Sequence, residues 1–299
     1  MRLLVLLESS ADVRIPPHRD PRSGRVRVGW QVNRLDPAAA HALDAALALR
    51  TAQPGTEVVA VLLGSAEDDV FLRDALARGC DEVVRVWDGE CRGLHAPGKA
   101  LILAATCRAA RCDLVLAGEA GAATSSAQVG VLVAAHLDVP CVTRAVELEM
   151  QPGGAVRVTR ALAGGFREIV EVSPPALFTF VTAELDVSPA PVPAVLGAHA
   201  RAVPVWDLAE IGVPREDVRR ADGSVRYGRA GTPRPATRAV PPPDPAAPAF
   251  ERIGELVRGT VRRRDGRVSS RPAEESAEEL FRLMRDRGWL DHLRKGEDE

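Results

Sequence analysis

The chain has 299 residues, of which 46% are hydrophobic and 27% charged, and its formal net charge at pH 7 is −2. Proteins bound mainly by nucleic-acid phosphates or by an anionic bilayer carry a clear positive excess, so this balance argues against both partners. No apolar run reaches the roughly 18–20 residues that a membrane span needs. Only two of the 39 basic residues are lysines, Lys99 and Lys295.

The cysteines fit neither a disulfide framework nor a metal site. Their number is odd, no Cys-x-x-Cys pair occurs, and no histidine pair completes a zinc-ligand pattern. We therefore expect no metal, and we expect structural thiols in a reducing, cytoplasmic location. The five residues are Cys80, Cys91, Cys107, Cys112 and Cys141.

The first half of the chain alternates short apolar runs with segments of helical periodicity. The runs predict strands over residues 3–7, 58–63, 82–87 and 114–117, and helices between and after them over 38–49, 68–77, 99–110 and 126–137. This alternation predicts a doubly wound α/β fold with a mainly parallel sheet. Apolar runs without alternation are typical of strands buried on both faces. Residues 12–35 interrupt the pattern and predict a hairpin or a protruding loop after the first strand.

The pattern changes after residue 137. Alternating residues joined by glycine pairs predict added antiparallel strands over residues 141–150, 155–162 and 167–172, and a further strand over 177–182. We expect residues 1–213 to form one domain that ends in antiparallel structure near residue 186. Prolines then predict a semi-extended linker over 214–248.

Residues 249–299 are expected to form a C-terminal helical arm. Its helix opens at Pro272 and ends near Gly288, with acidic residues in the first turn and arginines toward the end, as the helix dipole favours. Its apolar stripe consists of Ala277, Leu280, Phe281, Met284 and Leu290.

The most informative segment runs from Gly118 to Gly130. A strand ends at its first residue, small residues follow, and three hydroxyl side chains precede an apolar helix. Free N–H groups at a helix start attract anions, and glycine lets a phosphate come close. The alternative is an ordinary helix with a Ser or Thr cap. The segment alone leaves a phosphate site and a capped helix equally open.

No other residues form a convincing catalytic group. A serine hydrolase would need a tight Gly-x-Ser-x-Gly turn, which the sequence lacks. We find no convincing acid–base pair or nucleophile, so no catalytic residues are assigned.

Four passages resemble the beta subunit of electron transfer flavoproteins. They are the first strand with the loop to Asp12, the segment from Asp36-Pro37 into the next helix, residues 73–81 (Arg-Asp-Ala-Leu-Ala-Arg-Gly-Cys-Asp), and the loop that ends in Ala127-Gln128-Val129-Gly130. The likeness covers about residues 1–213 and returns in the last helix. It implies a Rossmann-like fold of the adenine nucleotide alpha hydrolase type.

The resemblance also implies a function, cofactors and partners. The beta subunit forms a heterodimer with an alpha subunit, shares its FAD, holds AMP or a second FAD itself, and carries electrons from a dehydrogenase donor. The alternative is an adenine-nucleotide-binding regulatory or scaffold module without redox activity. The cofactor-binding residues that the resemblance implies are Leu6, Asp36, Leu63, Gly118, Glu119, Gly121, Thr124, Ser125, Ser126, Ala127, Gln128 and Val129.

The sequence departs from the family at two functional places. Glu119 stands where the family usually has a basic residue, and Ala123 and Ser125 stand where the family's loop has two carboxylates, so we expect weakened or retuned nucleotide binding. Val192 stands where the family presents a leucine to dehydrogenases, so partner choice should change. The expected partner-docking residues are Val192, Pro193, Val195 and Leu196.

Overall fold

The computed structural model describes residues 1–12, 14–18, 20, 26–27, 31–122, 125–182, 190–225, 243–258 and 271–289. The chain divides into two compact units, Met1–Gly228 and Arg229–Glu299. We call the first unit the body and describe each unit by itself. Within the described residues, no helix combines the length and the apolar character needed to cross a bilayer.

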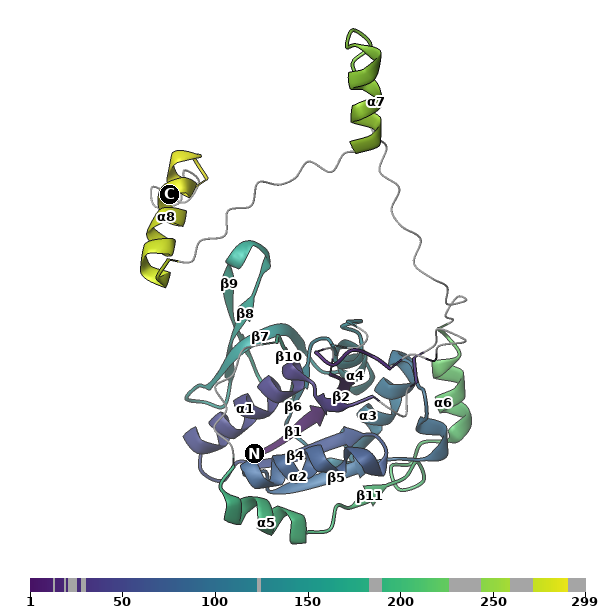
Figure 1. Cartoon of the computed structure of the whole chain (residues 1–299). Coiled ribbons are helices and arrows are strands. Elements are labelled where there is room, and N and C mark those ends of the chain that lie inside the picture. The colour runs from purple at the N-terminus through teal and green to yellow at the C-terminus, as the bar shows by residue number, and fades with distance from the viewer. Residues whose placement is uncertain are drawn as a thin grey trace. The chain divides into compact units, whose positions relative to one another are not determined.

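Among the described residues of the body, nine strands form one sheet in the order β11-β5-β4-β1-β6-β10-β7-β8-β9 (Figure 1). All neighbours from β11 to β7 are parallel, and β7, β8 and β9 form an antiparallel meander. The strands are β1 Arg2–Leu7, β4 Glu57–Leu63, β5 Glu82–Val86, β6 Leu114–Gly118, β7 Cys141–Met150, β8 Val156–Ala161, β9 Arg167–Val172, β10 Ala176–Phe180 and β11 Val205–Trp206. A separate antiparallel pair, β2 Ser9–Ala11 and β3 Asn33–Leu35, follows β1.

Helices cover both faces of the sheet. Because successive strand residues point to opposite faces, Leu3 and Val5 join one buried cluster and Leu4 and Leu6 join the other. The first cluster includes residues of α1 Pro37–Ala52, α2 Asp69–Arg78 and α5 Val192–Ala200, and the second includes residues of α3 Ala96–Ala110, α4 Val129–Leu137 and α6 Arg215–Asp222. The predicted doubly wound α/β class with added antiparallel strands is confirmed.

The strand order places a topological switch beside β1. The chain runs from β1 outward through β4 to β5 and then returns to β6, which pairs with the other side of β1. Ligands of open α/β sheets bind outside the carboxyl ends of the strands at such a switch. The loops after β1 and β6 therefore mark the expected binding edge.

Two expectations need correction. The strand expected at 177–182 is β10, which is parallel and lies between β6 and β7, so the body does not end in antiparallel structure there. Helix α5 follows β10 in the chain, and Pro193 fits its first turn. Residues 215–222, expected within the linker, form α6, because Val218 is buried against the core on the α3 side. Residues 226–242, which make up most of the remaining linker, lie outside the described residues.

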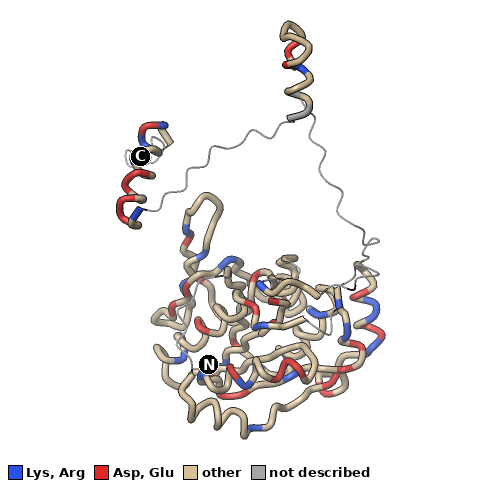
Figure 2. The backbone as a smooth tube through the Cα atoms, in the orientation of Figure 1, with Lys and Arg blue, Asp and Glu red and all other residues tan. Residues whose placement is uncertain are grey.

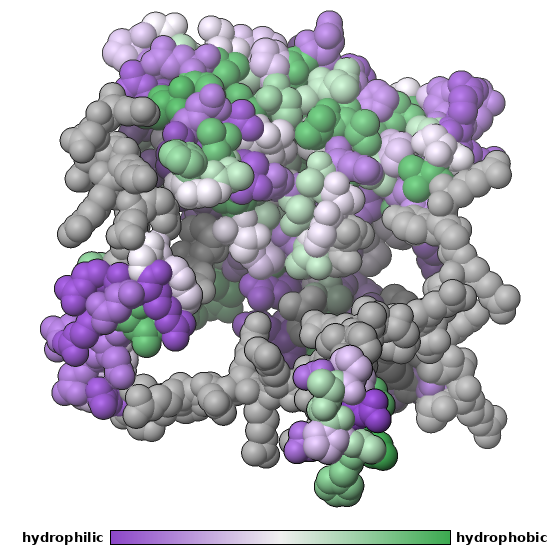
Figure 3. Space-filling model, turned by 90° about the horizontal axis from the view of Figure 1, so that it is seen from above, coloured by the Kyte–Doolittle hydropathy of each residue, from purple (hydrophilic) through white to green (hydrophobic). Residues whose placement is uncertain are grey.

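Charges of both signs are interspersed over the body, in keeping with the small net charge (Figure 2). In the second unit, α7 spans Ala249–Arg258 and α8 spans Ala273–Asp286, and Gly288 follows α8 with φ 67°. Both helices expose large apolar side chains among hydrophilic ones (Figure 3). These are Phe250, Ile253 and Leu256 on α7 and Leu280, Phe281 and Leu283 on α8. Leu290 lies outside the described residues.

Candidate functional site

A hollow opens at the carboxyl edge of the sheet, between the ends of β1 and β6. Its walls come from the residue after β1, the loop from β6 to α4, the start of α3 and Val225, which follows α6 in the chain. We call it the edge pocket. It is lined by Glu8, Leu94, His95, Ala96, Lys99, Gly118, Glu119, Gly121, Ser126, Ala127, Gln128, Val129 and Val225.

Two glycines allow the loop after β6 to lie close to its neighbours. A Cβ on Gly118 would be 2.9 Å from the backbone nitrogen of Ala39 at the start of α1. A Cβ on Gly121 would be 2.5 Å from the Glu8 Oε2 atom. A larger residue at Gly118 would push the loop away from the backbone of α1, and one at Gly121 would displace the Glu8 side chain.

Asp36 holds the loop after β6 in place through a hydrogen bond to its backbone. Its carboxylate is 1% exposed, and its Oδ1 atom accepts a hydrogen bond from the Ala38 N–H at 3.0 Å, which caps α1. The Oδ2 atom accepts from the Ala122 N–H at 2.6 Å. The Asp36 N–H donates to the carbonyl of Glu8 at 2.9 Å. Asp36 therefore supports the pocket without lining it.

The loop ends in an unusual backbone. Ser125 and Ala127 have φ values of 48° and 51°, in the left-handed region, so the helix expected from residue 126 begins instead at Val129. The side chain of Gln128 makes no capping hydrogen bond among the described residues. Amides of an uncapped first turn favour an anion, and both Gln128 and Val129 line the pocket.

The charged side chains of the pocket have mixed signs. The Glu8 Oε1 atom lies 3.4 Å from the Lys99 Nζ atom, and the Glu119 Oε1 atom lies 3.8 Å from the Arg144 Nη1 atom. All four side chains are partly exposed, so each pair is weak, in the range of about 0–1 kcal/mol. The lining therefore offers two carboxylates and the ammonium of Lys99.

Helix α6 packs beside the pocket and contacts the residue that precedes α3. The Asp222 Oδ1 atom accepts from the His95 N–H at 2.6 Å, and the Oδ2 atom lies 2.9 Å from His95 Nδ1. A Cβ on Gly98 would be 2.8 Å from Asp222 Oδ1. Because His95 is the N-cap residue of α3, the carboxylate from α6 holds the start of that helix through the backbone N–H and the ring of His95.

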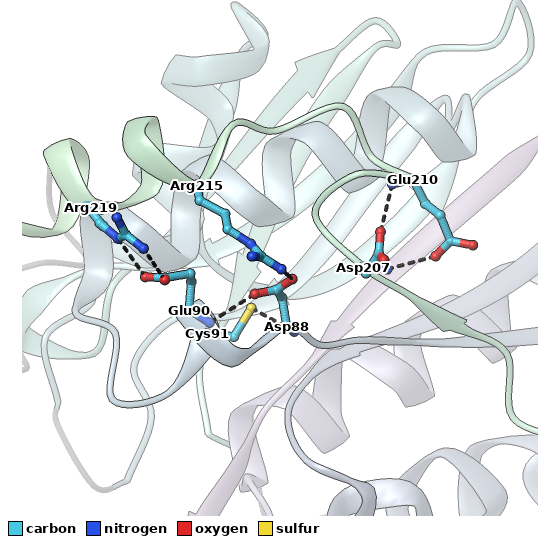
Figure 4. Close-up of polar contacts among 7 residues, drawn as sticks. All are labelled: Asp88, Glu90, Cys91, Asp207, Glu210, Arg215 and Arg219. Carbon is cyan, nitrogen blue, oxygen red and sulfur yellow. Dashed lines mark hydrogen bonds and ion pairs between the residues drawn. The ribbon is translucent and has the colours of Figure 1, made fainter.

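Ion pairs attach α6 to the short helix Gly89–Cys91 (Figure 4). Arg215 donates to Asp88 at 2.9 Å, and Arg219 pairs with Glu90. The pKa of Asp88 is lowered by the Glu90 backbone N–H and then by Arg215, and that of Glu90 by Arg219. In the segment before α6, Asp207 and Glu210 cap each other's backbone N–H groups (Figure 4).

Seven of the twelve expected cofactor residues line the edge pocket: Gly118, Glu119, Gly121, Ser126, Ala127, Gln128 and Val129. Leu6 is buried in β1 and Leu63 ends β4, and neither lines it. Ser125 is exposed outside it, and Thr124 lies outside the described residues.

Sequence reasoning missed the contribution of α3. Glu8, His95 and Lys99 line the pocket but were not among the expected residues. The position of Glu8 directly after the first strand was the available signal. Lys99 was placed at the start of a helix, although α3 begins three residues earlier, at Ala96.

The expected docking residues lie on α5. Val192 and Leu196 are 71% and 65% exposed and stand one helical turn apart. Pro193 is also exposed, whereas Val195 packs against the core. The guanidinium of Arg73 on α2 donates to the carbonyls of Ala198, His199 and Arg201, which fixes the end of the helix.

The fold and the pocket together define a doubly wound, Rossmann-like α/β protein whose candidate ligand site lies at the topological switch. The family model of the electron transfer flavoprotein domain matches residues 30–211. The chain therefore belongs to the electron transfer flavoprotein family and is a beta-subunit-like protein of that family, as the sequence resemblance indicated.

Several characterised proteins are similar to the chain. It is 30% identical over 265 residues to the caffeyl-CoA reductase-Etf complex subunit CarD of Acetobacterium woodii, covering 87% of this chain and 93% of that protein. It is 30% identical over 222 residues to the electron transfer flavoprotein subunit beta of Clostridium acetobutylicum, covering 73% and 83%. For the same subunit of Methylophilus methylotrophus, the identity is 31% over 178 residues, covering 59% and 67%.

Proposed function

We propose that this chain pairs with an electron transfer flavoprotein alpha subunit and that the heterodimer carries electrons from a dehydrogenase through FAD. The observation that carries the proposal is the match to relatives with beta-subunit names along most of their length, up to 94% of one of them. Flavin supplies the redox step when it is bound, and the protein supplies binding, orientation and electrostatics. A carrier subunit therefore needs no acid, base or nucleophile of its own.

The edge pocket is the proposed site for AMP or a second FAD. The close glycines and the uncapped start of α4 suit a phosphate. Glu8 and Glu119 oppose it, because two carboxylates in one pocket repel an anion. We therefore propose weaker nucleotide binding than a loop with a basic residue at position 119 would give.

The second unit is the proposed contact with the alpha subunit. An amphipathic helix on a proline-rich tether is stable mainly when its apolar face is buried. On α7, Phe250 is 87% exposed, and Leu280 and Phe281 are exposed on α8. We propose that a partner chain receives these side chains. The alternative is that they dock on the body.

Co-expression with the alpha subunit of the same genome tests the pairing. Native mass spectrometry of the purified material should show one copy of each chain, and a variant that ends at residue 248 should lose the partner. If neither the full chain nor the shortened variant is found bound to the alpha subunit, the proposed heterodimer is wrong. A pair that contains AMP but never flavin would favour the alternative of a regulatory or scaffold module without redox activity.

A further inference from the structure

The edge pocket contains a cation that the loop sequence does not supply. Among the described lining residues, Lys99 is the only side chain with a fixed positive charge. It lies in the first turn of α3 and is held there by Ala100 and Leu103, which are buried in the core of the body. The chain has only two lysines among its 299 residues, and one of them lines the edge pocket.

Contacts connect this lysine to the glycine loop. The carboxylate of Glu8 lies against Gly121, where a Cβ would be 2.5 Å from Oε2. The other oxygen of the same carboxylate is 3.4 Å from the Lys99 Nζ atom. One carboxylate therefore contacts both the ammonium and the loop, and the ammonium lines the same pocket as the loop.

We propose that Lys99 is the phosphate-binding residue of the edge pocket and replaces the basic residue missing at Glu119. An ammonium has three donors, so Lys99 can keep Glu8 and still donate to an anion. The Glu8 pair is partly exposed, and such pairs are weak and readily change partner. The inference rests on the proposed nucleotide site.

The proposal also explains how a pocket with two carboxylates can hold an anion. Without Lys99, a phosphate would meet Glu8 and Glu119 with no fixed positive charge among the described lining residues to offset them. With it, one fixed positive charge stands beside the loop. Glu8 then lowers the affinity twice, because it repels the anion and because it shares the ammonium.

Calorimetric titration of the purified heterodimer with AMP and with adenosine tests the role of Lys99. Lys99→Gln should weaken AMP binding by about ten- to a hundredfold, the usual effect of losing a hydrogen bond to a charged group. It should leave adenosine binding unchanged, because adenosine has no phosphate. Lys99→Arg should keep AMP affinity within a few fold, and Glu8→Gln should raise it.

The outcomes separate this inference from the proposed site. Suppose the unaltered heterodimer binds AMP, and Lys99→Gln has the same ratio of AMP affinity to adenosine affinity as the unaltered protein. The proposed role of Lys99 is then wrong, but the nucleotide site stands. If the unaltered heterodimer binds neither compound, the nucleotide site itself is wrong and Lys99 has no such role. Thermal unfolding serves as the folding control, because a partly exposed side chain should change the Tm little.

Discussion

The carboxylate of Asp36 accepts a hydrogen bond from the backbone N–H of Ala122 at 2.6 Å, across 86 residues of sequence. The same carboxylate caps α1 through Ala38. One buried acid therefore joins a helix start to the loop of the edge pocket. Both carboxylate oxygens accept hydrogen bonds within the protein, so Asp36 shapes the pocket without lining it.

Removal of this carboxylate should loosen the loop and destabilise the body. Asp36→Ala loses a helix cap and a charge-assisted hydrogen bond, so we expect a loss of about 2–4 kcal/mol in the free energy of unfolding. Asp36→Asn keeps an acceptor for the cap but cannot also accept from Ala122, and should lose about 1 kcal/mol. Urea unfolding measures both. Equal losses for the two variants would contradict separate roles for the two oxygens.

The charge at position 119 should control nucleotide affinity. Glu119→Gln removes a carboxylate from the pocket lining, and Glu119→Lys adds a cation, so AMP affinity should rise in that order. The cost of losing the Arg144 pair is small, because both side chains are partly exposed. Calorimetry measures the affinity, with Glu149→Gln on β7, outside the pocket, as the control. Equal AMP affinity with Glu, Gln or Lys at position 119 would show that Glu119 does not oppose the ligand.

The α6 helix should loosen in acid. The folded-state pKa values of Asp88 and Glu90 lie below their ordinary values, so their ion pairs stabilise the folded state above about pH 4 and that stability is lost as the pH falls below it. Hydrogen exchange of α6 amides should therefore accelerate between about pH 6 and about pH 3, relative to α4 and after correction for intrinsic rates.

Variants of α6 provide the matched test of this attachment. Arg215→Ala combined with Arg219→Ala should loosen α6 already at neutral pH, because both residues pair with the body. Arg220→Ala should not, because Arg220 pairs with Asp217 on the same helix. If the double variant exchanges like Arg220→Ala, the ion pairs do not hold the helix.

Cys112 should be the first thiol to react with iodoacetamide at neutral pH. The side chain of Cys107 lowers the pKa of Cys112, whereas burial raises the pKa of Cys80 to about 12 and also raises that of Cys141. The thiolate is the nucleophile. Peptide mass spectrometry over time measures the order, and Cys107→Ala should slow labelling at Cys112. Faster labelling of Cys141 would contradict the expected order.

The α5 surface should govern reduction by the dehydrogenase. Val192→Glu places a charge on a surface that we propose docks the donor, so the transfer rate should fall at least tenfold while the Tm stays unchanged. Val70→Glu is the control, because Val70 is also an exposed valine, at 54%, but lies on α2. Stopped-flow reduction of the heterodimer by its cognate dehydrogenase measures both. Equal rates in the two variants would place the docking surface elsewhere.

Much of the fold follows from local sequence patterns. Strands β7 and β9 have the predicted bounds, and β1, β4, β5 and β6 differ by one residue at an end. Continuous apolar runs mark strands buried on both faces, and this signal is strong. The place of β10 between β6 and β7 was not predicted, because hydropathy records which residues are buried but not which strand they pair with.

The candidate site was predicted only where it lies on one continuous segment. The loop from Gly118 to Val129 carries its own glycine and hydroxyl signals. Lys99 and His95 reach the pocket from α3, and Asp222 supports it from α6 through contacts 127 residues apart. Proline content suggested a linker around α6, whose attachment depends on ion pairs and one buried valine. Such long-range pairs leave no local pattern.

The central claim is that this chain forms a redox-active flavoprotein with an alpha subunit. The most direct measurement is the visible absorption spectrum of the co-purified heterodimer during anaerobic titration with dithionite. We predict a yellow complex with about one FAD or more for each pair, bleached on reduction and restored by an electron acceptor. A stable heterodimer that is colourless, and stays so after incubation with FAD, would contradict the claim.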